Sequence, residues 1–195
     1  MDYKLSILVC TLPQRAESYK RLQDELQKQI DQNTEYRIER IANAHPTMSI
    51  GDKRNELLEM ATGEYVCFID DDDMISTTYI ETLLKGIETS PDCISLRGVI
   101  TWDGGRPEVF EHSIKYTEYK TVKDYRGSEP TFIKYLRFPN HLNCIKSSIA
   151  KQFKFPSSNF GEDTDWATQV FNSGLLKNEY YTDNILYQYL YRTNK

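Results

Sequence analysis

Two acidic segments carry the side chains in this sequence that are best suited to do chemistry. The first, Asp70-Asp71-Asp72-Asp73, directly follows the unbroken apolar run Tyr65–Ile69. Four adjacent carboxylates repel one another at a partly buried strand end unless a cation neutralises them or water reaches them. Because Mg²⁺ and Mn²⁺ prefer oxygen ligands, the segment predicts a divalent metal site. A solvated acidic turn that caps the following helix is the alternative.

The second acidic segment, Glu162-Asp163, follows Gly161 and leads into a predicted helix. The free N–H groups and the dipole of a helix N-terminus stabilise carboxylates, which would explain the pair without any catalytic role. A glycine at this point also lets the backbone approach a ligand closely. If the two acidic segments converge on one site, one would hold a metal and the other would accept a proton.

Other uses of the first segment can be tested by spacing. A calcium loop of the EF-hand type is excluded, because Met74 and Ile75 stand where it needs an oxygen ligand and a glycine. A phosphohydrolase in which Asp70 or Asp72 takes a phosphoryl group remains open. A binding module that keeps the metal site without turnover also remains open.

Hydrophobic patterning predicts the elements that position these segments. Strands are expected at Leu5–Cys10, Tyr36–Ala42, Tyr65–Ile69 and Cys93–Thr101, and helices between them. This alternation predicts an α/β fold with a mixed, mostly parallel sheet flanked by helices. The turn Asp103-Gly104-Gly105 predicts a hairpin that adds antiparallel strands. In such sheets ligands bind at the carboxyl ends of the strands, which is where the four aspartates fall.

Length and charge narrow the classes of function. With 195 residues and no linker, the chain is expected to be a single domain, 1–195. Its net charge of −5 disfavours binding of a nucleic-acid backbone. The single apolar run near the start is too short for a signal peptide or a transmembrane segment, so a cytoplasmic protein is expected. The four scattered cysteines are expected to be reduced core thiols.

Several segments together resemble the family 2 glycosyltransferases of the GT-A fold, which use nucleotide-sugar donors. In chain order these are Leu5–Thr11, Gly51–Asn55, Ala61–Val66, Phe68–Asp73 and Gly161–Asp163. They cover about a third of the sequence and span most of its length. The resemblance implies that residues 1–100 form a nucleotide-sugar-binding half and residues 101–195 an acceptor-side half. It also implies transfer of a sugar to an acceptor hydroxyl with inversion of the anomeric centre.

The resemblance assigns roles residue by residue. Asp72 would be the principal ligand of Mn²⁺ or Mg²⁺, and Asp70 would reach the metal or the donor's ribose. Asp163, with Glu162 beside it, resembles the general base that deprotonates the acceptor. The implied donor-binding residues, with a UDP-sugar as the expected donor, are Thr11, Arg15, Asn43, Lys53, Arg54, Asp70 and Asp71. The acceptor, a saccharide or a macromolecule, is left open.

The sequence departs from the family pattern in two places. Asn43 stands in the region where many members carry an acidic residue for the nucleobase; it is expected either to hydrogen-bond a base edge or to form a turn. The C-terminal region has tyrosines in place of a histidine that would add a metal ligand. Two other histidines are open: His141 is either a surface residue or a contact to acceptor or diphosphate, and His112 is expected to point outward from its strand.

Overall fold

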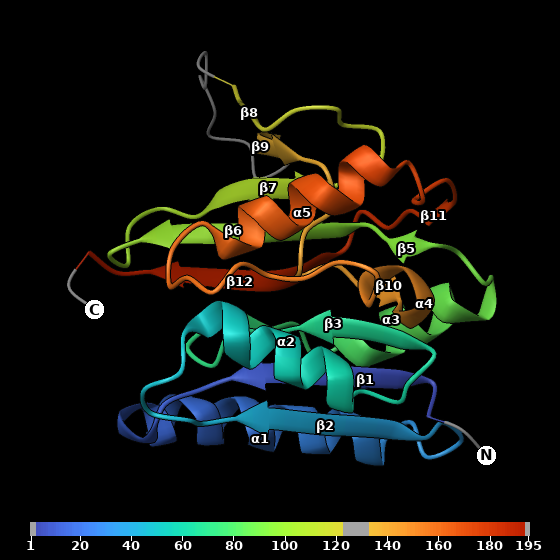
Figure 1. Cartoon of the computed structure of the whole chain (residues 1–195). Coiled ribbons are helices and arrows are strands. Elements are labelled where there is room, and N and C mark those ends of the chain that lie inside the picture. The colour runs from blue at the N-terminus through green and yellow to red at the C-terminus, as the bar shows by residue number, and fades with distance from the viewer. Residues whose placement is uncertain (1–2, 123–132, 194–195) are drawn as a thin grey trace.

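A computed structural model of the chain describes residues 3–122 and 133–193. It contains two six-stranded sheets with helices packed around them (Figure 1). The fold is mixed α/β, as the sequence predicts, but the strands are divided between two sheets and do not form one. Each sheet combines strands from both halves of the chain. β4 (Met74–Ile75), from the first half, pairs in the second sheet, and β10 (Ile145–Lys146) and β11 (Glu179–Tyr180), from the second half, pair in the first.

The first sheet has the order β11-β5-β10-β3-β1-β2. Its centre is β1 (Leu5–Cys10), which lies parallel to β2 (Ile38–Asn43) on one side and to β3 (Tyr65–Phe68) on the other. The 3-10 turn η1 (Pro13–Arg15) and helix α1 (Ala16–Asp31) connect β1 to β2, and helix α2 (Ile50–Met60) connects β2 to β3. Strand β5 (Cys93–Ile94) lies beyond β10. The carboxyl ends of β1 and β3 therefore lie side by side.

The second sheet has the order β4-β12-β6-β7-β9-β8. Strands β6 (Leu96–Trp102) and β7 (Glu108–His112) form the predicted antiparallel hairpin, with Val99 opposite Val109. On either side of the hairpin, β12 (Ile185–Tyr191) runs parallel to β6, and β9 (Ile133–Arg137) runs parallel to β7. The short edge strand β8 (Lys120–Thr121) pairs with β9.

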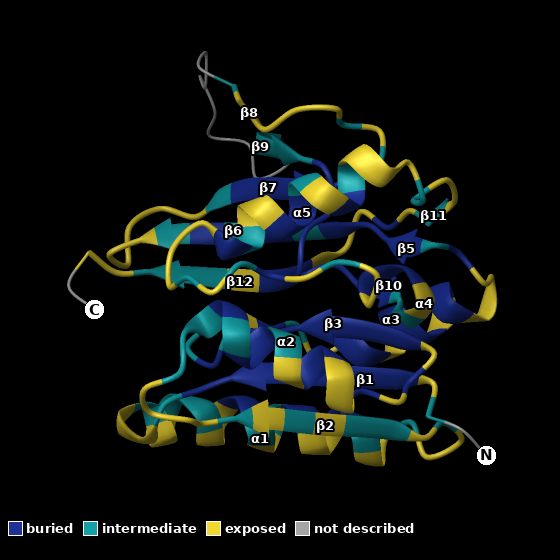
Figure 2. Cartoon of the chain, viewed as in Figure 1, coloured by how far each residue is buried: buried dark blue, intermediate teal, exposed yellow. Residues whose placement is uncertain are grey.

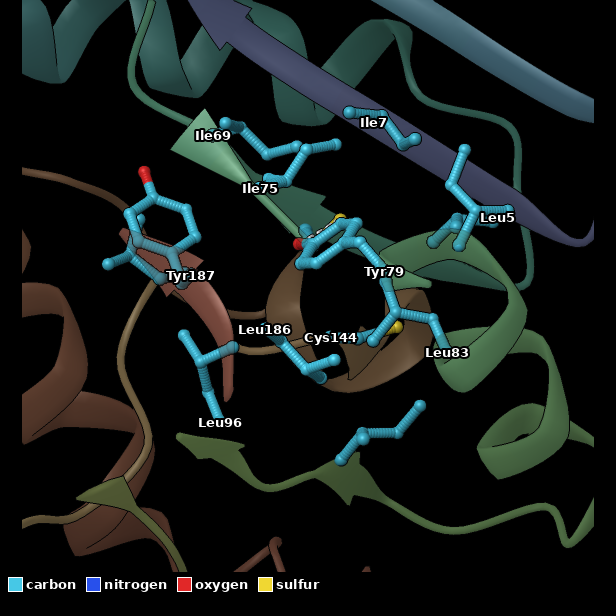
Figure 3. Packing of buried hydrophobic residues seen from close by; sticks show 14 of the residues in the cluster. Leu5, Ile7, Ile69, Ile75, Tyr79, Leu83, Leu96, Cys144, Leu186 and Tyr187 are labelled. Atoms are coloured by element: carbon cyan, nitrogen blue, oxygen red, sulfur yellow. Dashed lines mark hydrogen bonds between the residues drawn. The ribbon is translucent and has the colours of Figure 1, made fainter. Parts of the chain in front are cut away.

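The core follows the two-residue period of the central strands. Leu5, Ile7 and Val9 of β1 face one hydrophobic cluster, which also contains α1, helix α3 (Tyr79–Glu88) and the second sheet (Figure 3). Leu8 and Cys10 face the other cluster, with α2, α4 (Ser147–Ala150) and α5 (Glu162–Ser173). Both β1 and β3 are buried on both faces (Figure 2), so β3 is apolar throughout and β1 is apolar except for Ser6, whose hydroxyl is hydrogen-bonded to Glu39 and to the Gly63 N–H.

Two local features follow from residue type, the cap of α2 and the burial of the cysteines, which were expected as reduced core thiols. The Ser49 hydroxyl caps α2 by accepting a hydrogen bond from the Asp52 backbone N–H at 3.1 Å. All four cysteines are buried free thiols. In the part of the chain that is described, no helix is long and apolar enough to cross a membrane.

Candidate active site

The four consecutive aspartates point in different directions once β3 has ended. Asp71 turns toward the end of β1, where its carboxylate accepts hydrogen bonds from Thr11 Oγ1 at 2.7 Å and from Arg15 at 2.9 Å. Its side chain is only 1% exposed, and this burial raises its pKa although both partners favour the charged form. Asp71 therefore fastens the loop after β1 to the loop after β3.

Asp73 turns the opposite way, into the second sheet. It is fully buried and accepts hydrogen bonds from the Tyr187 hydroxyl at 2.9 Å and the Leu190 backbone N–H at 2.8 Å. Burial, reinforced by Asp70, raises the pKa of Asp73 to about 8. The Tyr187 hydroxyl also accepts the backbone N–H of Asp70 at 3.1 Å, so β12 holds both ends of the acidic run.

Asp70 and Asp72 remain as the partly exposed members of the run. Their side chains are 27% and 18% exposed, respectively. Arg15 lies 3.6 Å from a carboxylate oxygen of Asp72, and an Arg54 nitrogen lies 3.2 Å from a carboxylate oxygen of Asp70. These are the two aspartates to which the sequence assigns a metal.

Arg54 of α2 joins the two acidic segments. Its guanidinium is 3% exposed and donates hydrogen bonds to Asp70 and to Glu162 of α5. Burial lowers the pKa of Arg54, but the neighbouring Asp70 and Glu162 more than offset it and the pKa is raised. The predicted convergence of the two acidic segments is thus brought about by a buried cation.

Glu162 and Asp163 differ in their surroundings although they are adjacent. Glu162 is buried against Arg54, and burial raises its pKa. The side chain of Asp163 is 37% exposed, and in the described part of the chain it forms no ion pair with Arg54. Gly161 precedes them with φ of 76°, a left-handed conformation that a residue with a side chain adopts at a cost. After the turn at Gly161, Glu162 therefore packs against Arg54 and Asp163 stays partly exposed.

His141 lies between the two segments and is buried, 4% exposed, so it is not a surface residue. Its Nε2 lies 3.0 Å from an Arg54 nitrogen, which can only donate, so Nε2 accepts and the ring proton sits on Nδ1. Burial, and then the Arg54 charge, holds the pKa of His141 well below its usual range. The Nδ1–H is buried, lacks a hydrogen-bond partner in the described chain, and lies 3.9 Å from Oδ2 of Asp163.

The polar groups of Lys53 and Asn43 are bonded to other parts of the chain and not to the acidic segments. The Lys53 ammonium is buried and donates to the Thr11 carbonyl at 2.9 Å, and burial lowers its pKa. Asn43 accepts the His45 backbone N–H at 2.9 Å and donates to Glu56 at 2.7 Å. The Asn43 side chain thus forms the turn that the sequence analysis considered, through its bond to His45.

The carboxylates of Asp70 and Asp72 have the right chemistry for a divalent cation. Both are oxygen donors of the kind that Mg²⁺ and Mn²⁺ prefer, and both keep some exposed surface. Asp71 and Asp73 are occupied by their own partners. Across residues 3–122 and 133–193, no three His, Cys, Asp or Glu side chains gather as a metal cluster. A cation here would need further ligands from water or a bound ligand.

The sequence reasoning missed part of the site. His112 was expected to point outward, but it is buried, with Nδ1 3.2 Å from Asn143 Oδ1, because β7 lies inside the second sheet and is covered. The role of Tyr187 was also missed. A signal for it existed in the alternating tyrosines of β12, which the sequence analysis noted only as replacing a histidine.

Comparisons with known proteins agree with this geometry. Residues 17–151 match the family described as glycosyl transferase family 2. A relative from Haloferax volcanii, named glucosyl-dolichyl phosphate glucuronosyltransferase, is 26% identical over 123 residues, which are 62% of this chain and 35% of that protein.

Solved structures show the same fold. S. aureus TarS 1-349, crystallised in complex with UDP-GlcNAc, superposes with a TM-score of 0.66 and 17% identity over 98% of this chain and 60% of that one. A second structure of S. aureus TarS gives a TM-score of 0.56 and 14% identity over 96% of this chain and 37% of that one. This chain spans 60% or less of each of these relatives. Because the family match covers more than half of the chain, this protein belongs to glycosyl transferase family 2.

Proposed function

We propose that this chain transfers a sugar from a nucleotide-sugar donor to an acceptor hydroxyl. The observation that carries the proposal is that Arg54 pairs both with Asp70, at the end of β3, and with Glu162, the neighbour of Asp163. Membership in a glycosyltransferase family favours transfer over the phosphohydrolase that the acidic run alone left open. A UDP-sugar is the proposed donor, because a neighbour of the same fold was crystallised with UDP-GlcNAc.

Residues 1–100 supply the donor side in this proposal. Thr11, Arg15 and Asp71 fasten together the two loops against which the nucleotide would lie. Asp72, with Asp70, would hold Mn²⁺ or Mg²⁺. Lys53, bonded to the Thr11 carbonyl, and Arg54, bonded to Asp70, would keep these two loops in position. A divalent cation supplies charge neutralisation for the diphosphate of the donor as the glycosidic bond breaks. The turn that Asn43 forms with His45 would lie beside the nucleobase.

Residues 101–195 supply the acceptor side. As the acceptor oxygen bonds to the anomeric carbon, the bond to the diphosphate breaks and its electron pair leaves with the diphosphate. The hydroxyl proton passes to the Asp163 carboxylate, which is exposed enough to meet it. A single base opposite the leaving group gives inversion. The Nδ1–H of His141 is placed to donate to the attacking group or to a bridging water.

A ligand screen tests the proposal. Thermal unfolding is measured with UDP, UDP-GlcNAc and other nucleotide sugars, each with and without Mn²⁺, because a ligand that binds the folded state raises the apparent stability. We expect one nucleotide sugar to raise the melting temperature only with the cation, and NMR to show an inverted product once an acceptor is found. Turnover of p-nitrophenyl phosphate without any nucleotide-sugar binding would favour the phosphohydrolase instead. Binding without transfer or hydrolysis across a broad acceptor panel would favour the non-catalytic module.

A further inference from the structure

A cavity of about 320 Å³ opens beside Asp70 and Asp163, over one face of the second sheet. Its volume lies within the range of small-molecule sites, about 300–1,000 Å³. Alternate residues of three neighbouring strands form its lining, because side chains two apart in a strand share a face. These residues are Ile100 and Trp102 of β6, Phe110 and His112 of β7, and Tyr135 and Arg137 of β9. The sheet therefore contributes the aromatic rings of Trp102, Phe110 and Tyr135 to the lining, and such rings suit the apolar face of a sugar ring.

Arg137 is the one arginine or lysine among the described residues that line this cavity. Its guanidinium lies 4.8 Å from the ring centre of Tyr119 and 5.5 Å from that of Tyr135, so the two aromatic rings fix its position. One terminal nitrogen donates to the backbone carbonyls of Lys120 and Leu136, both at 3.0 Å. The other terminal nitrogen and Nε donate no hydrogen bond to the residues that the structure describes, so both can bind a ligand.

Arg137 differs from the other buried or half-buried arginines among the described residues, each of which pairs with a carboxylate. Arg97 and Lys115 both pair with Glu111, and Arg54 pairs with Asp70 and Glu162. Arg137 forms no ion pair with any carboxylate in residues 3–122 and 133–193, in a chain whose net charge is −5. Burial without a counter-charge lowers its pKa. A fixed, partly desolvated guanidinium with free donors is suited to bind a carboxylate or a phosphate through two hydrogen bonds.

A second group in the same cavity also lacks a partner. His141 lines it, and its buried Nδ1–H has no hydrogen-bond acceptor in the part of the chain described. A buried donor without an acceptor costs free energy, which a ligand hydroxyl would recover. The cavity thus offers aromatic walls, a neutral donor beside Asp163, and a cation at β9. These are the features of a site for a sugar that carries a negative charge.

We propose that this cavity binds an anionic saccharide and that Arg137 recognises its carboxylate or phosphate group. The inference rests on the proposed function, because it names the class of sugar that this site selects. The anionic group has two possible sources, the transferred sugar of the donor and the acceptor. Arg137 is a specificity-determining residue in either case, since it lies on β9 and the proposed base Asp163 lies on α5.

The test compares matched anionic and neutral ligands. In the acceptor arm, isothermal titration measures methyl glucuronide against methyl glucoside, and glucose 6-phosphate against glucose. In the donor arm, it measures UDP-glucuronic acid against UDP-glucose, both with Mn²⁺. We expect the protein to bind the anionic member of a pair at least tenfold more tightly in one arm, and that arm identifies the source. Arg137→Gln should bring the ratio to within about twofold while binding of the neutral ligand stays unchanged.

Two further variants complete the design. Arg137→Lys keeps the charge but loses the planar pair of donors, so an intermediate ratio is expected. This variant also serves if Arg137→Gln loses its folded circular dichroism spectrum. Arg40→Gln, an exposed arginine on β2 in the other sheet, is the matched control and should leave the ratio unchanged.

Equal affinity for both members of every pair, or a preference that persists in both Arg137 variants, overturns the inference. If nucleotide sugars bind with Mn²⁺ but show no Arg137-dependent preference in either arm, the inference fails and the proposed function stands. If the free anionic saccharides bind through Arg137 but no nucleotide sugar binds, the proposed function fails and the inference stands.

Discussion

Nδ1 of His141 lies 3.9 Å from Oδ2 of Asp163, so the two side chains face one another across a gap too long for a direct hydrogen bond. Arg54 fixes the histidine from its other side, through Nε2 at 3.0 Å. The gap leaves the Asp163 carboxylate without the neutralising contact that Glu162 has with Arg54. Because of this difference, the proposed mechanism assigns the proton transfer to Asp163 and not to the adjacent Glu162.

Asp163→Asn should therefore abolish most transfer while sparing donor binding. An amide keeps the shape of the side chain but cannot take the proton, and a positioned base contributes a factor on the order of 10² to 10⁴ in rate. We expect the rate of sugar transfer to fall by that factor, measured by release of nucleoside diphosphate. The affinity for the nucleotide sugar, measured by titration, should change by no more than about twofold.

Asp165→Asn is the matched control, because Asp165 is an exposed acidic residue of the same helical turn. Its rate should equal that of the unmodified protein. A similar loss of rate in both variants would mean that the negative charge at the start of α5 matters, not a proton transfer at Asp163.

Asp72→Asn should remove the part of donor binding that depends on the cation. An amide oxygen is a weaker ligand than a carboxylate for Mg²⁺ or Mn²⁺, while Asp71 and its contacts to Thr11 and Arg15 stay in place. We expect the rise in melting temperature with UDP to be the same with and without Mn²⁺ in this variant. Asp24→Asn, at an exposed position on α1, should keep the difference. An undiminished cation effect in Asp72→Asn would exclude Asp72 as a ligand.

The strands and the strand-end position of the first acidic segment could be predicted from the sequence. Strands β1 and β3 are almost entirely apolar because both faces are buried, with Ser6 as the polar exception in β1. Ser49 marks the start of α2 by its cap. The family resemblance rested on these segments, and the family match confirms it. These features depend on residues that are near one another in the chain, which is why a pattern can reveal them.

The directions of the individual aspartates could not be predicted, because four identical residues carry no local signal that distinguishes them. Asp71 turns to Thr11 and Asp73 to Tyr187, which are sixty or more residues away in the chain. His141 is buried for the same kind of reason, since its environment is set by Arg54 on another element. The part of the site that depends on such long-range contacts becomes visible only in the folded structure.

Arg54→Met should destabilise the protein strongly, because it leaves Glu162 buried without its cation. Removing one partner of a buried ion pair costs about 3–5 kcal/mol in the free energy of unfolding. The double variant Arg54→Met with Glu162→Gln should recover part of this loss, since the uncompensated buried charge is gone. Arg40→Met, at an exposed position, should change the free energy by no more than about 0.5 kcal/mol. Urea unfolding measures all three, and a double variant no more stable than Arg54→Met would contradict the role of charge compensation.

The lowered pKa of Glu111, which lies outside the candidate site, predicts that the stability of the fold depends on pH. Its side chain is fully buried on β7, and burial disfavours its charge, but Lys115, Tyr116 and Arg97 outweigh burial and lower its pKa to about 2. Because the folded pKa lies below the unfolded value of about 4.5, the ionised form stabilises the fold above pH 4.5. That contribution is lost as the pH falls from about 4.5 through about 2.

Glu111→Gln should therefore lose stability at neutral pH and lose progressively less in acid. We expect the variant to unfold with a free energy about 3–5 kcal/mol lower at pH 7, as for a broken buried ion pair, and the difference to shrink steadily below pH 4.5. Urea unfolding at pH 7, 4 and 2.5 measures it. Glu118→Gln removes one acidic charge from an exposed position nearby and should differ little from the unmodified protein at every pH. If the Glu111→Gln deficit were as large at pH 2.5 as at pH 7, packing of the side chain and not its charge would be the cause.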